Sequence, residues 1–156
     1  MALEIEHKFL LCSTEWQKQV QRSIKMRQGY LNSAADMCSV RVRTSDTQAW
    51  INVKSATAGT QRQEYEYLIP YADGAAMLEQ LAQKPLIEKT RFYVNIAPHT
   101  WEIDVFEGDN KGLVVAEIEL SQVGEKFQRP AWLAKEVTDD IRYYNTSLAK
   151  KPYCNW

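Results

Sequence analysis

The sequence predicts a mainly β, α+β protein: a closed eight-stranded antiparallel β-barrel with helices packed on the outside. Three observations lead to this prediction. Strand-like segments alternate polar and apolar residues along most of the chain. Several of these segments carry two charges of one sign at positions i and i+2, which places both charges on the same sheet face. Short polar or glycine-containing turns separate the segments.

The first half of the chain supplies five of the expected strands. The first covers residues 2–10, where alternation places Leu3, Ile5, His7 and Phe9 on one face and Glu4, Glu6 and Lys8 on the other. A helix is expected over 15–24, because Thr14 and Gln17 offer a capping box and apolar residues recur every four positions. Further strands are expected over 25–31, 39–44, 49–54 and 62–69.

The second half supplies the remaining three strands. A helix is expected over 74–83, since Pro70 ends the preceding strand and Asp73 can cap a helix. Strands follow over 86–96, 100–106 and 113–120, and a glycine-rich turn at 108–112 indicates a hairpin between the last two. Beyond residue 121 the pattern predicts a short helical turn near 129–133 and a helix over 139–149. One domain, residues 1–156, is the natural expectation at this length.

Composition excludes several classes of partner. The net charge is −1, so no overall field attracts nucleic acid or a membrane surface. No apolar run approaches the roughly 20 residues of a membrane span, and the acidic N-terminus does not resemble a signal peptide. Three widely spaced cysteines without C-x-x-C spacing favour free thiols in a reducing compartment. We therefore expect a cytoplasmic protein without nucleic-acid or membrane partners.

The same-sign charge pairs are the most informative pattern. They occur at Glu4/Glu6, Arg41/Arg43, Glu64/Glu66, Lys89/Arg91, Glu102/Asp104 and Glu117/Glu119. An antiparallel sheet with one face in water would also alternate, but a solvated face usually mixes signs and adjacent like charges are destabilising. Sorting by sign therefore favours a barrel with the charges inside. A dry interior of this kind would be prohibitively costly, so we expect it to hold water and a ligand.

The residue types predict what that ligand is. A barrel of about eight strands is wide enough for one small ligand. Carboxylates favour hard divalent cations such as Mg²⁺ or Mn²⁺ over soft metals. Rows of Arg and Lys match a chain of phosphate oxygens. The interior therefore fits a polyphosphate together with divalent metal.

These residues, in this order, resemble the CYTH superfamily of triphosphate tunnel metalloenzymes, and in particular its small bacterial-type members. The matching elements are Glu-x-Glu-x-Lys at Glu4, Glu6 and Lys8, then Arg41/Arg43, Lys54, Glu64/Glu66, Lys89/Arg91, Glu102/Asp104 and Glu117/Glu119. The segments Gln28-Gly29-Tyr30-Leu31 and Glu136-Val137-Thr138 also match. The resemblance spans essentially the whole chain. It implies an eight-stranded barrel, open as a tunnel, that binds a triphosphate with divalent metal.

The resemblance also implies roles for individual residues. The expected phosphate-binding residues are Lys8, Arg41, Arg43, Lys54, Lys89 and Arg91. The expected ligands of two Mg²⁺ or Mn²⁺ sites are Glu4, Glu6, Asp104, Glu117 and Glu119. Arg62, Glu64, Glu66 and Glu102 are expected to support them. The catalytic prediction names Lys8, Tyr30 and Lys89, with Tyr30 hydrogen-bonded to Lys89 so that it can transfer a proton.

Family members act on several triphosphates, so alternatives stay open. Divalent-metal-dependent hydrolysis of inorganic triphosphate to pyrophosphate and phosphate is the leading hypothesis, because this compact chain has no evident insert that could recognise an organic group. An adenylate cyclase making cyclic AMP from ATP and a thiamine-triphosphatase are the alternatives. A non-enzymatic polyphosphate-binding module is disfavoured, since an anion binder gains nothing from so many carboxylates. A homodimer through an outer barrel face is compatible with the family.

Overall fold

A computed structural model describes residues 2–33 and 37–156. The described chain forms strands β1 Ala2–Leu11, β2 Val20–Tyr30, β3 Cys38–Thr44, β4 Ala49–Ser55, β5 Gln61–Ile69, β6 Ile87–Ile96, β7 His99–Phe106, β8 Val114–Glu119 and β9 Leu133–Glu136. Its α-helices are α1 Tyr71–Gln80 and α2 Asn145–Lys150. Short 3-10 turns include Glu15–Gln19 and Ile141–Tyr143.

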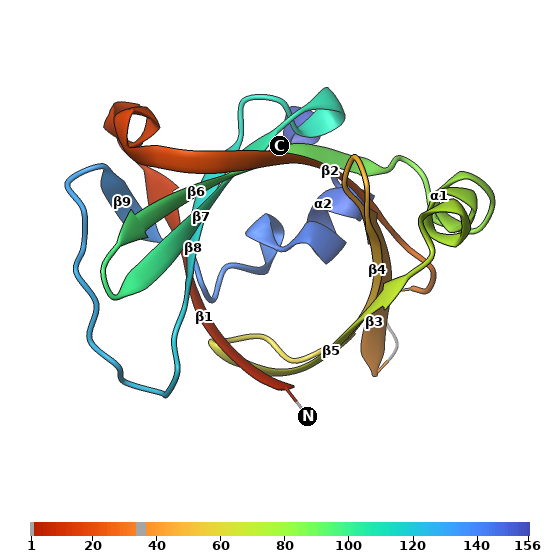
Figure 1. The fold of residues 1–156 in the computed structure, drawn as a ribbon, viewed down its shortest axis with the longest axis horizontal. Helices are drawn as coiled ribbons and strands as arrows, with labels where there is room; N and C mark the ends of the chain where they lie inside the picture. The colour runs from red at the N-terminus through yellow and green to blue at the C-terminus, as the bar shows by residue number, and fades with distance from the viewer. Residues whose placement is uncertain (1, 34–36) are drawn as a thin grey trace.

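Eight of the strands close into a ring. The order is β5-β4-β3-β2-β6-β7-β8-β1, and pairing of β1 with β5 joins the two ends, as the ribbon in Figure 1 shows. Every pairing is antiparallel, which confirms the predicted eight-stranded antiparallel barrel. Strand β9 adds to β1 outside this ring.

Strand β1 makes the closure by changing partners along its length. Its first residues pair with β5, so that Glu4 lies opposite Arg62. Its second half pairs with β8, so that Lys8 lies opposite Glu117. Phe9 and Leu11 also pair with β9. The strand that carries the family motif is therefore also the strand that seals the barrel.

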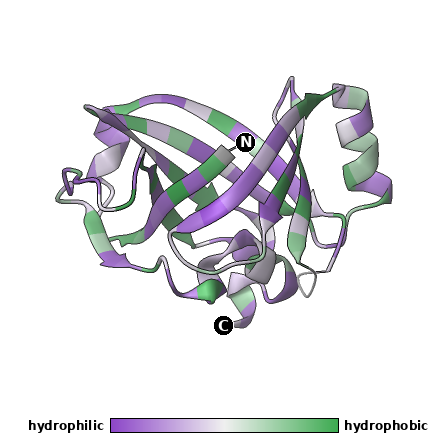
Figure 2. Ribbon diagram, turned by 90° about the horizontal axis from the view of Figure 1, so that it is seen from below, coloured by the Kyte–Doolittle hydropathy of each residue, from purple (hydrophilic) through white to green (hydrophobic). Residues whose placement is uncertain are grey.

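The outer face of the barrel carries the main apolar core. Phe9, Trp101 and Ile118 are fully buried there, packed beneath the segment that follows β8 and carries Trp132. The rings of Phe9 and Trp101 meet edge to face with centroids 5.7 Å apart. His7 shares this face, and its Nδ1 lies 2.8 Å from Glu136 Oε1. The predicted alternation of β1 is confirmed, and Figure 2 shows the same alternation along the other strands.

Helix α1 covers part of the outer face near β3 and β4. Leu78 and Ala82 pack against Val42 in a second apolar cluster. Gly74 allows the close approach: a Cβ built on it would lie 2.4 Å from the Cβ of Ala49. The predicted helix at 74–83 is real but is displaced, since it runs from Tyr71 to Gln80.

Helix α2 occupies one end of the barrel, not its outer wall. Leu148 is fully buried in a cluster with Tyr30, Ile87 and Val115, all of them on lumen-facing strand positions. In Figure 1 the C-terminal segment lies across the opening, and in Figure 2 it lies beyond that end. The tunnel implied by the family resemblance is thus covered at this end by an apolar plug.

Three local predictions were wrong. Residues 15–24 form a short 3-10 turn, Glu15–Gln19, followed by strand β2. The four-residue apolar spacing there also fits the two-residue alternation of a strand, and pairing with β6 decides between them. A turn closed by Leu133 N donating to Pro130 O does lie in the expected 129–133 segment, but no strand was expected beyond residue 121, and Leu133–Glu136 form strand β9. The expected final helix divides into the 3-10 turn Ile141–Tyr143 and α2.

Candidate active site

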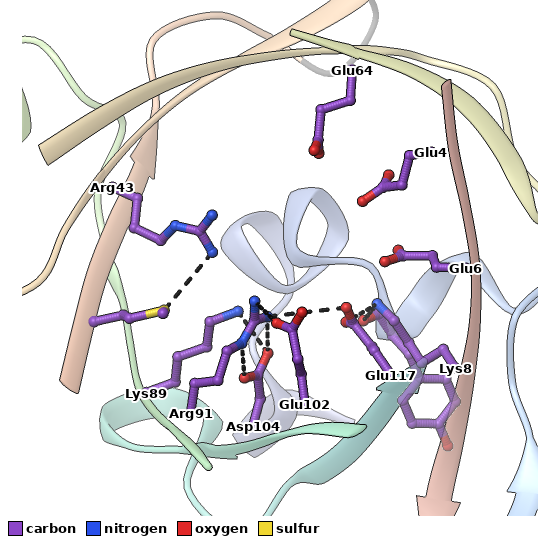
Figure 3. Close-up of polar contacts among 12 residues, drawn as sticks. Glu4, Glu6, Lys8, Arg43, Glu64, Lys89, Arg91, Glu102, Asp104 and Glu117 are labelled. Carbon is purple, nitrogen blue, oxygen red and sulfur yellow. Dashed lines mark hydrogen bonds and ion pairs between the residues drawn. The ribbon is translucent and has the colours of Figure 1, made fainter. Parts of the chain in front are cut away.

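The barrel encloses a polar cavity of about 160 Å³. Its basic lining residues are Lys8, Arg41, Arg43, Lys54, Arg62 and Arg91, and its acidic ones are Glu4, Glu6, Glu64, Glu66, Glu102, Glu117 and Glu119. These residues face the lumen from β1 and from each of the strands β3 to β8, as Figure 3 shows for several of them. Tyr30, Ser39 and Asn52 add neutral polar groups, and Tyr144, Asn145 and Thr146 supply the floor at the α2 end.

Across neighbouring strands most of the charges alternate in sign. Glu4 lies opposite Arg62, Lys8 opposite Glu117, Lys54 opposite Glu64, and Arg91 opposite Asp104. Same-sign rows along a strand are therefore stable because each row faces an opposite row. Two register pairs break the rule: Glu6 faces Glu119, and Glu102 faces Glu117. Negative charge consequently accumulates on the β1, β8 and β7 side of the cavity.

Glu4 is one of the perturbed carboxylates of this cavity. Burial, with a further contribution from neighbouring Glu6, raises the pKa of Glu4 to about 8. Lys54 Nζ lies 2.8 Å from Glu4 Oε2, but within the described chain that oxygen is buried and has no partner in hydrogen-bonding geometry. The pKa of Glu119 is also raised, by burial and then by Glu102. The site holds carboxylates whose charge the protein only partly neutralises.

A buried network lies behind the cavity wall. Lys89 Nζ donates to Asp104 Oδ2 at 2.7 Å, and Arg91 Nε donates to Asp104 Oδ1 at 2.7 Å, as drawn in Figure 3. Burial lowers the pKa of Lys89 to about 7. Burial would raise the pKa of Asp104, but Arg91 and Lys89 hold it below its ordinary value. This network fixes the Arg91 guanidinium at the cavity edge.

Glu117 is held by cations on both sides. Lys8 Nζ lies 3.3 Å from one carboxylate oxygen and Arg91 Nη2 lies 4.0 Å from the other. Although burial opposes it, Lys8 and then Arg91 keep the pKa of Glu117 well below its usual range. Lys8 also donates to the backbone carbonyl of Tyr143 at 3.2 Å, which ties the family lysine to the C-terminal segment.

The opposite side of the cavity is rich in arginine. Arg43 Nη2 donates to Glu66 Oε2 at 3.0 Å. Burial, followed by repulsion from Arg41 and Arg91, lowers the pKa of Arg43 to about 10. Arg41 is buried too, and its Nε has no hydrogen-bond partner among the described residues. Three guanidinium groups that repel one another in this way have the chemistry to bind an anion.

The structure brings most of the sequence-predicted residues to one cavity. Lys89 and Asp104 are the exceptions, because they pair with each other behind its wall. In the described part of the chain no hydrogen bond joins Tyr30 to Lys89, although both face the barrel interior.

Sequence reasoning missed five lining residues: Ser39, Asn52, Tyr144, Asn145 and Thr146. Asn52 could have been found, since it lies two residues before Lys54 on the same strand. No pattern in the sequence indicated that Tyr144 would reach the cavity. Lys8 Nζ lies 5.2 Å and Arg62 Cζ lies 5.0 Å from the centroid of its ring. Its hydroxyl accepts a hydrogen bond from the backbone N–H of Gly59.

Comparison with known proteins identifies the family. The CYTH domain model matches residues 2–153. The chain belongs to the CYTH family. It is 43% identical over its full length to an inorganic triphosphatase of Acetivibrio thermocellus, 99% of which is covered. It is 34% identical over 94% of its length to an inorganic triphosphatase of Nitrosomonas europaea, 96% of which is covered. A crystal structure of an inorganic triphosphatase superposes with a TM-score of 0.68 at 32% identity, covering 96% of this chain and 95% of that one.

CYTH triphosphate tunnel metalloenzymes depend on a divalent metal. The donor chemistry of this cavity fits such an ion, because carboxylate oxygens are hard ligands and Glu4 Oε2 is a buried oxygen without a hydrogen bond. Among the described residues, however, no group of three His, Cys, Asp or Glu side chains is gathered closely enough to hold a metal. The carboxylates that could bind a metal either pair with a basic side chain or lie too far from the other carboxylates. Metal binding therefore requires some of these side chains to change rotamer.

No helix in the described parts of the chain combines the length and the apolar character needed to cross a lipid bilayer.

Proposed function

We propose that this chain hydrolyses inorganic triphosphate to pyrophosphate and phosphate with the help of a divalent metal. The observation that carries the proposal is a small cavity, lined by opposed rows of basic and acidic side chains. The proposal is supported by 43% identity, over the full length, to an inorganic triphosphatase.

The size of the cavity favours an inorganic substrate. At about 160 Å³ the charged part of the interior is smaller than the roughly 300–1,000 Å³ pockets that enclose drug-sized organic ligands, although a hollow of about 520 Å³ adjoins it at Arg43, Glu66, Arg91 and Glu102. The lining of the cavity is charged almost throughout, so it offers little apolar surface to a purine or a thiamine ring. A compact polyanion matches both the volume and the charge.

The basic side chains would bind the phosphate oxygens through charge-assisted hydrogen bonds. Lys8, Arg41, Arg43, Lys54 and Arg91 face the cavity and are the proposed phosphate ligands. Several of them now pair with carboxylates, for example Arg43 with Glu66. Phosphate would replace those carboxylates as the acceptor. Lys89 reaches the substrate only by leaving Asp104, so we propose that Asp104 positions Lys89 and Arg91.

Glu4, Glu6 and Glu119 would hold the metal, Mg²⁺ or Mn²⁺, and a second site would draw on Glu117. The first three share the acidic side of the cavity, and Glu6 and Glu119 are direct cross-strand neighbours. A cation there would offset the burial and the repulsion from Glu6 that together raise the pKa of Glu4. When bound, it would neutralise phosphate charge and polarise the phosphoryl group.

Tyr30 remains the proposed proton-transfer partner of Lys89. With its pKa lowered to about 7, Lys89 can exchange a proton near neutral pH. Because no hydrogen bond joins the two side chains in the described structure, ligand binding would have to bring them together. Tyr30→Phe should therefore lower kcat at saturating metal, and an unchanged kcat would remove Tyr30 from the mechanism.

The function is tested by assaying the purified protein with inorganic triphosphate, thiamine triphosphate and ATP, each with Mg²⁺ or Mn²⁺. We expect phosphate release to be fastest with inorganic triphosphate and to stop when a chelator is added. Cyclic AMP formed from ATP would favour the cyclase alternative. Failure to turn over inorganic triphosphate with either metal would contradict the proposal.

A further inference from the structure

Gln28 is a buried amide that the site described above leaves unexplained. It lies on β2, within the Gln-Gly-Tyr-Leu segment, and its exposed fraction is 0%. Within the described chain neither its Oε1 nor its Nε2 has a hydrogen-bond partner. An unsatisfied buried polar group costs about 1–3 kcal/mol of stability, so few are kept without a reason.

The strand register places this amide beside the arginine side of the cavity. Gln28 pairs with Arg43 on β3 and with Ile87 on β6. Residues directly opposite in this way have Cβ atoms about 4.5–5.5 Å apart and share a sheet face. Arg43 lines the cavity and Gln28 does not. The amide is therefore next to the Arg43 side chain and one layer behind the cavity surface.

Arg43 has donors to spare. Its Nη2 donates to Glu66, while its Nη1 points at the sulfur of Met26 at 3.8 Å, the contact dashed in Figure 3. A thioether is a weak acceptor, and a guanidinium carries five N–H donors. Burial and the repulsion from Arg41 also lower the pKa of Arg43 to about 10, which indicates a cation short of acceptors. A strong amide acceptor without a partner lies directly across the ladder.

Binding of a phosphate chain would change the direction of this side chain. Phosphate oxygens would compete with Glu66 for the cavity-facing N–H groups of Arg43. Because the guanidinium is a rigid planar fork, turning one edge toward the phosphate also turns the other edge. That inner edge now meets Met26, and Gln28 Oε1 is the better acceptor within reach.

We propose that Gln28 is a positioning residue of the triphosphate site: its amide oxygen accepts a hydrogen bond from Arg43 in the phosphate-bound state and holds the guanidinium against the phosphate. This inference rests on the proposed function and deepens it. The unsatisfied amide destabilises the free protein and is satisfied when the substrate is bound.

The test is Gln28→Met, which keeps the length of the side chain and removes its polar atoms, with Gln28→Leu as a second variant. We expect the free protein to melt at a higher temperature, because an unsatisfied amide is removed. We expect kcat/KM for inorganic triphosphate to fall about tenfold to a hundredfold, the range for a lost hydrogen bond to a charged group. Gln63→Met, at an exposed position on β5, is the matched control and should change neither quantity.

A double-mutant cycle with Arg43→Met assigns the effect. In the Arg43→Met background, Gln28→Met should cause no further loss of kcat/KM. A purely structural glutamine would instead lower the melting temperature, and its loss of activity would not depend on Arg43; that result overturns the proposal. An unchanged kcat/KM in Gln28→Met also overturns it.

The proposed function and the role of Gln28 can be tested separately. Turnover by the wild-type protein tests that function alone. If turnover is absent, the rise in melting temperature caused by inorganic triphosphate becomes the readout. This rise must be smaller in Gln28→Met than in the wild-type protein, and an equal rise would contradict the role of Gln28.

Discussion

At the scale of single residues, the charged side chains of the cavity form ion pairs with one another that a ligand could replace. Lys54 lies 2.8 Å from Glu4, Arg62 lies 3.0 Å from Glu6, and Arg43 contacts Glu66. Under the proposed function, the basic group of each pair takes the place of a metal ion, and the carboxylate takes the place of a phosphate. Binding a metal triphosphate would exchange both sets of partners at once, so that little charge would be left unpaired in either state.

Glu4 gives a pH-dependent prediction. Its pKa is about 8 in the folded protein and about 4.5 when unfolded, so the folded state binds more protons between these values. Wild-type stability should therefore fall as the pH rises from 4.5 to 8 and change no further from this cause. Glu4→Gln removes that fall. We expect the metal-free variant to be about 1–3 kcal/mol more stable than the wild type above pH 8.

Urea unfolding with a chelator present, at pH 5 and pH 8.5, measures this difference. The same variant should lose triphosphate turnover while remaining folded. Glu15→Gln, which affects only an exposed ion pair with Lys18, is the control and should behave as the wild type does. A stability difference that does not grow with pH would show that Glu4 ionises normally.

The charged residues of the cavity could be predicted because alternation along a strand is a local property. Glu4 and Glu6 must share a face wherever that strand lies. Their partners could not be predicted, since cross-strand register depends on the whole fold. The sequence therefore could not reveal that Asp104 holds Lys89 behind the cavity wall, or that Tyr144 reaches Lys8 from the C-terminal segment.

At the scale of elements, the contact between α1 and the barrel depends on one glycine. A methyl group at Gly74 would lie 2.4 Å from the Cβ of Ala49, well inside contact distance. Alanine favours a helix by about 1 kcal/mol over glycine, whereas overpacking a close contact costs about 1–3 kcal/mol. The cost of overpacking should exceed the gain in helix propensity, so we expect Gly74→Ala to lower the melting temperature by a few degrees.

Thermal unfolding of Gly74→Ala beside Glu79→Ala, an exposed substitution on the same helix, tests this expectation. Turnover at a temperature where both variants are folded should equal that of the wild type, because α1 lies outside the barrel and does not line the cavity. A Gly74→Ala variant as stable as Glu79→Ala would mean that the helix moves away from β4 at little cost.

The elements that were predicted wrongly share a cause. Residues 20–24 and 133–136 are strands because they pair with β6 and β1, partners far away in the sequence. The local pattern of residues 20–24 also fits a helix, and residues 133–136 are too few to show a strand pattern by themselves. The longer strands were predicted correctly because their charges alternate over many residues, which a helix would scatter around its axis.

At the scale of the whole molecule, closing the ring gives the site its enclosed character. Pairing of β1 with β5 places the acidic rows opposite the arginine side across one cavity, and α2 covers one end of it. The closed barrel could be predicted from the sign-sorted charges. Only an interior that all strands share brings the acidic and the basic rows together around one ligand. The plug could not be predicted, since residues 145–150 carry no pattern that distinguishes an end cap from an outer helix.

The double pairing of β1 also sets an order for assembly. During synthesis residues 2–11 are made before β3, β4 and β5, which can form a local meander on their own. The half of β1 that pairs with β8 must wait until residues 114–119 have been made. Until then the nascent chain exposes open strand edges and an unfilled apolar surface, the features that promote aggregation and recruit chaperones. The ring therefore closes only when β1 meets a strand that lies more than 100 residues later in the chain.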